Sequence, residues 1–190
     1  MNNIKWITLQ ANWIGYYEDV VSDELCDKIM HYSDNVKQLQ KSTYSTSTGK
    51  SDRSDERVKM DDGWFRNGEQ YYNEIKDCFL LALKKYQEKH HDCLCQRYTD
   101  FRLNKYSKGG FMSRHIDNIH HSHGQTYGYP QLTALLMLND DYEGGNFLIA
   151  ENEYETAKGS AIVFPSNFMF PHAVKKVEKG TRYSIVTWLM

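Results

Sequence analysis

The hydrophobic pattern of this chain changes its period part way along, and that change limits the folds open to it. Between Glu69 and about His90, large apolar residues recur three and four positions apart, which predicts a helix. Further along, the apolar residues fall into short β-capable runs separated by glycine and proline turns. Helices followed by short strands indicate a mainly β, α+β fold, a β-sandwich or jelly roll backed by N-terminal helices.

Local signals place further elements. Ser22 can cap a helix that reaches about Tyr32, because the acids after it favour the positive helix end. The stretch from Lys41 to Arg57 is polar and cannot bury itself, so it predicts a mobile loop. Strands are predicted over Gln96–Tyr106, Gln131–Leu138, Phe147–Ala150, Ser160–Phe164 and Thr181–Leu189, with a turn at Tyr142–Gly145.

Length and charge exclude several classes of protein. A chain of 190 residues with 40% hydrophobic and 25% charged residues is most simply one domain. The net charge of -2 offers no basic surface for a phosphate backbone, so no nucleic-acid partner is predicted. We see no signal peptide and no apolar stretch that could span a membrane, and we expect a cytoplasmic protein.

Three residues predict a metal site. On a strand, His115 and Asp117 would point to the same face and could converge on one ion, although such a pair also occurs by chance in solvated loops. His172 supplies a third ligand, the alternative being a structural histidine beside a turn proline. Two histidines and one carboxylate leave positions open, as non-haem Fe(II) oxygenases require, whereas structural zinc is closed by four protein ligands.

Arg182 predicts a site for an anionic cosubstrate. A molecule with two carboxylates needs a fixed cation, and a guanidinium meets a carboxylate with two parallel hydrogen bonds. The alternative is a surface arginine on an edge strand. Its neighbours Tyr183, Ile185 and Trp188 favour a buried strand instead, and a buried arginine needs a partner.

A series of motifs then runs through the second half of the chain. In order they are Tyr106, His115-x-Asp117, Tyr142-x-Gly-Gly145, Lys158-Gly159-Ser160, Phe164-Pro165, Pro171-His172-x-Val174 and Gly180-x-Arg182-Tyr183-Ser184. Over about Leu94–Met190 this series resembles the 2-oxoglutarate/Fe(II) oxygenases, and within them the prolyl 4-hydroxylase-like branch. The resemblance implies a double-stranded β-helix (a jelly roll, cupin-like) over 94–190, supported by helices and a loop in 1–93.

The resemblance also implies chemistry. Fe(II) would be held by His115, Asp117 and His172, with 2-oxoglutarate and O2 as cosubstrates and ascorbate as reductant. Arg182 would bind the distal carboxylate of 2-oxoglutarate, and Tyr106 would hydrogen-bond the same group. Two departures stand out: Asn146 follows the paired glycines where relatives often have an acid, and Arg182 stands where collagen-type enzymes tend to have lysine.

Other residues are candidates for the walls of the site. Thr133 or Leu135 would line the 2-oxoglutarate pocket, as neighbours on one face of a strand. Trp188 shares its strand face with Arg182 and would contribute to the substrate pocket, or else pack in the core. By resemblance, the loop carrying Arg53 and Ser54 would close over a peptide, and an exposed linker is the alternative.

A run of histidines follows the metal pair. In a polar stretch a flexible loop does not hold metal geometry, so we predict a solvated loop near the pocket mouth. The residues concerned are His120, His121 and His123.

The leading hypothesis is a 2-oxoglutarate-dependent dioxygenase that hydroxylates a prolyl residue of a peptide or protein and releases succinate and CO2. The prolyl part rests on resemblance alone. One alternative is hydroxylation of another amino-acid side chain or of a free amino acid. The alternative from another class is a non-catalytic jelly-roll binding module, which would have no need for all of His115, Asp117, His172 and Arg182.

Overall fold

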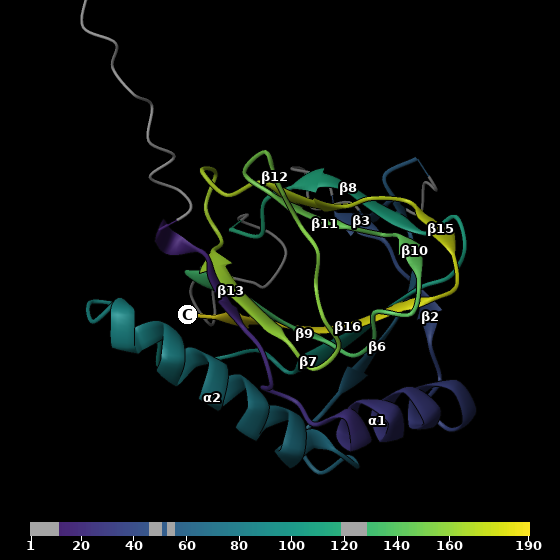
Figure 1. The fold of residues 1–190 in the computed structure, drawn as a ribbon, viewed down its shortest axis with the longest axis horizontal. Coiled ribbons are helices and arrows are strands. Elements are labelled where there is room, and N and C mark those ends of the chain that lie inside the picture. Colours follow the sequence, from purple (N-terminus) through teal and green to yellow (C-terminus); the bar gives the residue numbers. More distant parts are fainter. Residues whose placement is uncertain (1–11, 46–50, 53–55, 119–128) are drawn as a thin grey trace, which may run out of the picture.

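Two stacked antiparallel sheets form the body of the molecule in the computed structural model, which describes residues 12–45, 51–52, 56–118 and 129–190 (Figure 1). The larger sheet has the strand order β1 (Gly15–Tyr17), β13 (Ala161–Pro165), β9 (Leu132–Met137), β16 (Arg182–Leu189), β7 (Phe101–Tyr106), β6 (Asp61–Phe65) and β2 (Gln40–Lys41). The smaller sheet has the order β12 (Asn152–Tyr154), β11 (Phe147–Ile149), β14 (His172–Val174), β8 (Phe111–His115) and β5 (Val58–Lys59).

The path of the chain makes this sandwich a double-stranded β-helix. From β7 onward the strands alternate between the larger and the smaller sheet: β7, β9, β13 and β16 lie in one, and β8, β11 and β14 in the other. A short pair, β10 (Glu143–Gly144) with β15 (Val177–Lys179), joins the turns at one end. The predicted fold class is therefore confirmed, and the predicted strands correspond to β7, β9, β11, β13 and β16.

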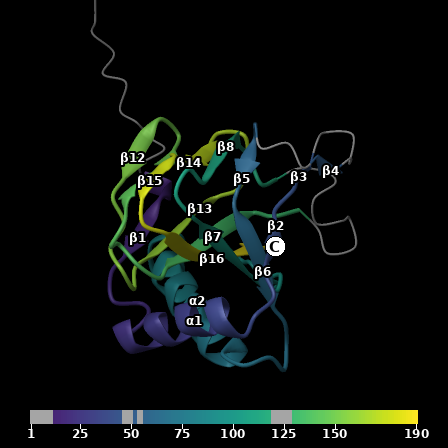
Figure 2. The same ribbon diagram turned by 90° about the vertical axis from the view of Figure 1, so that its right-hand side faces the viewer.

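Two helices cover the outer face of the larger sheet (Figures 1 and 2). Helix α1 (Asp23–Asn35) is capped as predicted, with Ser22 Oγ accepting from the Leu25 backbone N–H at 3.3 Å. Helix α2 (Tyr72–Lys89) begins three residues later than its apolar pattern predicted, because Tyr71 has left-handed backbone dihedrals. No helix in the described part of the chain is long and apolar enough to cross a membrane.

The alternation of side chains along the strands separates two cores. On β7, Phe101 and Leu103 face the helices, whereas Tyr106 faces the space between the sheets. The helix-side core includes Ile75, Phe79, Leu83, Tyr86 and Ile185. The core between the sheets includes Leu135, Met137, Phe147, Phe164, Val186 and Trp188. Any site built between the sheets is therefore enclosed by a rigid apolar barrel.

The predicted loop from Lys41 to Arg57 contains a short hairpin, β3 (Tyr44–Ser45) with β4 (Ser51–Asp52), and its mobility stays a prediction. Arg53 and Ser54 lie outside the described residues. One predicted boundary was wrong: strand β7 starts at Phe101 rather than Gln96. The segment before it contacts the end of β16 through an isolated bridge from Tyr98 to Leu189 and through backbone hydrogen bonds, one of them from Thr99 N–H to the Trp188 carbonyl at 3.0 Å.

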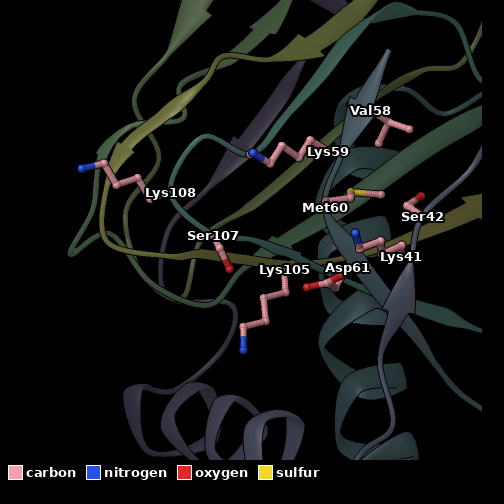
Figure 3. A pocket seen from close by; sticks show the side chains of 10 residues that line it. Lys41, Ser42, Val58, Lys59, Met60, Asp61, Lys105, Ser107 and Lys108 are labelled. Atoms are coloured by element: carbon pink, nitrogen blue, oxygen red, sulfur yellow. The ribbon is translucent and has the colours of Figure 1, made fainter. Parts of the chain in front are cut away.

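The free edges of the two sheets meet beside a small hollow of about 170 Å³ (Figure 3). Strand β2 brings Lys41 to this hollow and β5 brings Lys59, each from the edge of its sheet. In the register of the larger sheet, Asp61 lies between Lys41 and Lys105. Lysine on an edge strand opposes pairing with a second chain, so we interpret these residues as protection of the edges.

Candidate metal and cosubstrate site

The three predicted metal ligands converge on the inner wall of the smaller sheet. His115 ends β8 and His172 begins β14, and the two residues lie opposite each other in the register. One donor atom from each of His115, Asp117 and His172 lies within 4.8 Å of the other two. Asp117 Oδ2 is 3.2 Å from His172 Nε2, and Asp117 Oδ1 is 3.5 Å from His115 Nε2. Among the described residues this is the one group of three such ligands.

Asp117 reaches the site by a different route from the one predicted. Strand β8 ends at His115, so Asp117 lies in a bend beyond the strand and the simple alternation argument does not apply to it. The bend brings the carboxylate between the two imidazoles. The convergence was therefore predicted correctly, and the shared strand was wrong.

Backbone carbonyls fix the proton on each imidazole. His115 Nδ1 lies 2.8 Å from the Ser113 carbonyl, and His172 Nδ1 lies 3.2 Å from the Phe170 carbonyl. Because a carbonyl oxygen only accepts, each Nδ1 donates a hydrogen to it. These bonds set the orientation of the two rings and leave Nε2 of each as the nitrogen that could bind a metal.

The carboxylate of Asp117 is ionised although it is buried. Burial by itself favours the neutral acid, but the contacts with His172 and His115 hold the pKa of Asp117 well below its usual range. The site thus offers one negative charge and two imidazole nitrogens in a buried setting, which fits a divalent ion such as Fe(II). Three ligands rather than four leave coordination positions open.

Arg182 forms the second part of the site. Its side chain is fully buried and lies opposite Tyr106 in the register of the larger sheet. One guanidinium nitrogen donates to Ser184 Oγ at 3.0 Å, another contacts Met137 Sδ at 3.3 Å, and Nε has no hydrogen-bond partner among the described residues. No described carboxylate lies within ion-pair distance of Arg182. A buried guanidinium without an anion fits a carboxylate ligand.

Tyr106 supports the same interpretation. The guanidinium carbon of Arg182 lies 5.4 Å from the centre of its ring. Burial raises the pKa of the Tyr106 phenol, and the Arg182 charge only partly opposes this rise. The phenol therefore stays protonated near neutral pH and can donate a hydrogen bond to an anion beside Arg182.

The paired glycines of the Tyr142 motif make room for this arginine. Gly145 has a φ of 64°, and a Cβ atom there would lie 3.3 Å from Arg182 Cδ and 3.2 Å from the ring of Tyr142. The backbone conformation favours glycine, and a side chain would press on both neighbours. The glycine at position 145 of this motif is thus explained by its position behind Arg182.

The remaining predicted residues fall into two groups. One group is buried on the inner face of the larger sheet: Thr133, Leu135 and Trp188. Trp188 lies opposite Thr133 in the register, and the ring centres of Trp188 and Trp64 are 6.1 Å apart. Thr133 also donates to Asp117 Oδ2 at 2.8 Å, a contact that the sequence did not predict because it joins residues on different elements. Five residues named in the sequence analysis lie outside the described residues: Arg53, Ser54, His120, His121 and His123.

Comparisons with known proteins agree with this geometry. Residues 101–190 match the family model described as the 2OG-Fe(II) oxygenase superfamily. A PKHD-type hydroxylase of Stenotrophomonas maltophilia is 30% identical over 123 residues, which are 61% of this chain and 54% of that protein. Human prolyl 3-hydroxylase 2 is 38% identical over 69 residues, 33% of this chain and 10% of that protein. The chain spans about half of the first relative and a small part of the second.

Solved structures share the fold at low sequence identity. A viral collagen prolyl hydroxylase from Paramecium bursaria Chlorella virus-1 has a TM-score of 0.70 and 17% identity, covering 93% of this chain and 95% of that one. A prolyl hydroxylase from Trichoplax adhaerens, solved with a peptide fragment of a hypoxia inducible factor, has a TM-score of 0.71 and 17% identity, covering 96% and 86%. Residues 101–190 therefore match the 2-oxoglutarate/Fe(II) oxygenase superfamily, and the described chain shares its fold with prolyl hydroxylases.

Proposed function

We propose that this chain is an Fe(II)- and 2-oxoglutarate-dependent dioxygenase that hydroxylates a prolyl residue of a peptide or protein and releases succinate and CO2. One observation carries the proposal: two imidazoles and a carboxylate converge in the barrel that also buries the guanidinium of Arg182, which pairs with no carboxylate of the described residues. We also infer that 94–190 carries the site and that 1–93 supports it within one domain.

The residues of the chain would bind and orient the reactants. When bound, Fe(II) and 2-oxoglutarate supply the oxidation of a C–H bond by O2. His115 and His172 present Nε2 to the metal, and Asp117 adds the negative charge. Arg182 would hold the distal carboxylate of 2-oxoglutarate through paired hydrogen bonds, and Tyr106 would donate another. Ascorbate is the reductant that we expect in the assay.

The walls of the barrel would keep water away from the metal. The ring of Phe164 meets that of His172 edge-on at 4.9 Å between centres, and the ring of Phe147 lies 5.8 Å from it. Leu135 and Trp188 line the same space from the larger sheet, which also carries Phe164. A dry site strengthens the electrostatic contacts of the bound groups and limits side reactions.

The comparisons favour a peptide substrate. Three of the four relatives named above are prolyl hydroxylases, and one of these was solved with a peptide. The same chemistry could hydroxylate another amino-acid side chain or a free amino acid, and such a substrate is the second candidate. The non-catalytic alternative has less support, because a simple binding module does not require an ionised Asp117 between two metal-ready imidazoles.

A succinate assay tests the enzyme proposal. Purified protein with Fe(II), ascorbate, O2 and 2-oxoglutarate should form succinate, and His172→Ala should abolish it. His31→Ala, which changes an exposed histidine on α1, is the matched control and should leave it intact. Succinate formation that survives in His172→Ala, or that is absent from the parent with every peptide pool, would count against the proposal.

The prolyl proposal needs its own measurement. Peptides captured from a library should gain the mass of one oxygen atom on proline, and the same peptides with alanine in place of that proline should not react. Oxygen found on another residue type would support the second candidate instead. Oxidation of a free amino acid without any peptide would do the same.

A further inference from the structure

Asp117 is held in place by contacts that the sheet does not supply. Strand β8 pairs with β14 as far as His115 and His172, and the ladder stops there. Asp117 follows two residues later, in a bend. A carboxylate that must meet a metal within a few tenths of an ångström needs its rotation fixed by neighbouring groups.

Two hydroxyl groups provide this constraint. Thr133 Oγ1 lies 2.8 Å from Asp117 Oδ2 and 2.8 Å from Ser166 Oγ. An ionised carboxylate only accepts hydrogen bonds, so the single hydrogen of the Thr133 hydroxyl goes to Asp117. The hydrogen between the two hydroxyls must then come from Ser166. The order of donation is Ser166 to Thr133 to Asp117, and it runs in one direction only.

The backbone around this chain of hydrogen bonds is also tied together. Asn118 N–H, directly after Asp117, donates to the Ser166 carbonyl at 3.0 Å, and Ser166 N–H donates to the Gln131 carbonyl at 2.9 Å. Thr133 and Ser166 are 1% and 0% exposed, so water does not compete for these groups. The bend is therefore clamped between the start of β9 and the end of β13, both in the larger sheet.

We propose that Thr133 and Ser166 are positioning residues that fix the rotation of the Asp117 carboxylate and thereby set the affinity for the metal. The proposal rests on the proposed function, because it requires Asp117 to be a metal ligand. It revises the role that the sequence predicted for Thr133, which was to line the 2-oxoglutarate pocket. The two roles lead to different measurements.

Binding of Mn²⁺, a redox-stable substitute for Fe²⁺ at nitrogen and oxygen ligands, tests the proposal without any turnover. Free Mn²⁺ can be quantified by electron paramagnetic resonance. Thr133→Val removes the hydroxyl at nearly constant shape, and we expect it to weaken Mn²⁺ binding by roughly 10- to 100-fold. Thr133→Ser restores the hydroxyl and should bind nearly as the parent does. Ser166→Ala should lie between the two.

Thr187→Val is the matched control. Thr187 is a fully buried threonine on β16, on the face that is turned toward the helices and away from the metal site. Its hydroxyl donates to the Thr99 carbonyl at 2.9 Å. It should lose stability but keep its affinity for Mn²⁺. Binding of 2-oxoglutarate, measured at saturating Mn²⁺, should be unchanged in Thr133→Val.

The outcomes separate the two proposals. If Asp117→Ala binds Mn²⁺ as tightly as the parent, the proposed function itself is wrong. If Asp117→Ala loses binding but Thr133→Val and Ser166→Ala keep it, only the positioning role is wrong. If Thr133→Val keeps Mn²⁺ and loses 2-oxoglutarate, Thr133 lines the cosubstrate pocket as the sequence first predicted.

Discussion

At the scale of single residues, the site contains two buried charges that are compensated in different ways. Asp117 lies between His115 and His172, and these contacts lower its pKa despite burial. Arg182 is fully buried, its hydrogen-bond partners among the described residues are the Ser184 hydroxyl and the Met137 thioether, and no ion pair joins it to Asp117. A folded protein tolerates such a cation at a cost in stability, which a ligand can offset. An anion that binds Arg182 would therefore relieve this cost in stability.

Replacing Arg182 with methionine separates stability from binding. Methionine fills similar space without a charge, so the free energy of unfolding of the ligand-free protein should rise by about 1–3 kcal/mol. The affinity for 2-oxoglutarate should fall by roughly 30-fold or more, since loss of one partner from a buried charge pair costs about 2–5 kcal/mol. Urea titration and ligand binding at saturating Mn²⁺ measure the two effects.

The control for this prediction is metal affinity. Mn²⁺ binding should stay unchanged in Arg182→Met, because the arginine is not a metal ligand. Equal losses of Mn²⁺ and 2-oxoglutarate would mean that Arg182 maintains the barrel rather than binding the cosubstrate.

At the scale of elements, the turn between β10 and β11 holds the end of the barrel around Arg182. Gly144 has a φ of 72°, and a Cβ atom there would lie 2.4 Å from the carbonyl oxygen of Lys176. Gly68 has a φ of 90°, but nothing lies within 4 Å of the corresponding point. These two glycines therefore share a left-handed backbone and differ in the space around them.

Alanine substitutions at the two glycines should separate strain from collision. Gly68→Ala should cost about 1–2 kcal/mol, the penalty for a left-handed alanine. Gly144→Ala should cost about 1–3 kcal/mol more, because a backbone carbonyl cannot move aside as a flexible side chain can. Denaturant unfolding of both variants measures the difference. Equal costs would show that the turn relaxes freely and that the collision contributes nothing.

The elements also show how far the sequence could predict the structure. The caps and apolar periods of α1, α2 and β16 are local, so their ranges were correct to within a few residues. Asp117 was placed on a strand because the spacing of His115 and Asp117 does not reveal where the ladder stops. The bond from Thr133 to Asp117 was missed because it depends on how β9 lies against the end of β8, and nothing in the local pattern fixes that distance.

At the scale of the whole molecule, the site joins the two sheets. His115 and His172 come from the smaller sheet, while Arg182 and Thr133 come from the larger one. Asp117 belongs to both, since it follows β8 and is bonded to Thr133 on β9. The family motifs are spread over the second half of the chain because each contributes to this junction from a different strand. Ligands bound there should therefore stabilise the molecule as a unit.

Thermal unfolding tests this coupling. A ligand that binds only the folded state adds about 2.7 kcal/mol at one hundred times its dissociation constant. For a chain of this size that corresponds to a rise in Tm of roughly 5 to 10 °C with Mn²⁺. A chelator should reverse it, because removing the metal removes a ligand that binds only the folded state. 2-Oxoglutarate should add a further rise in the parent, and in Arg182→Met only the rise with Mn²⁺ should remain.

His172→Ala should show neither rise, whereas the exposed-residue control His31→Ala should show both. A full Mn²⁺ response in His172→Ala would mean that the metal binds elsewhere, and the junction between the sheets would then have no part in it.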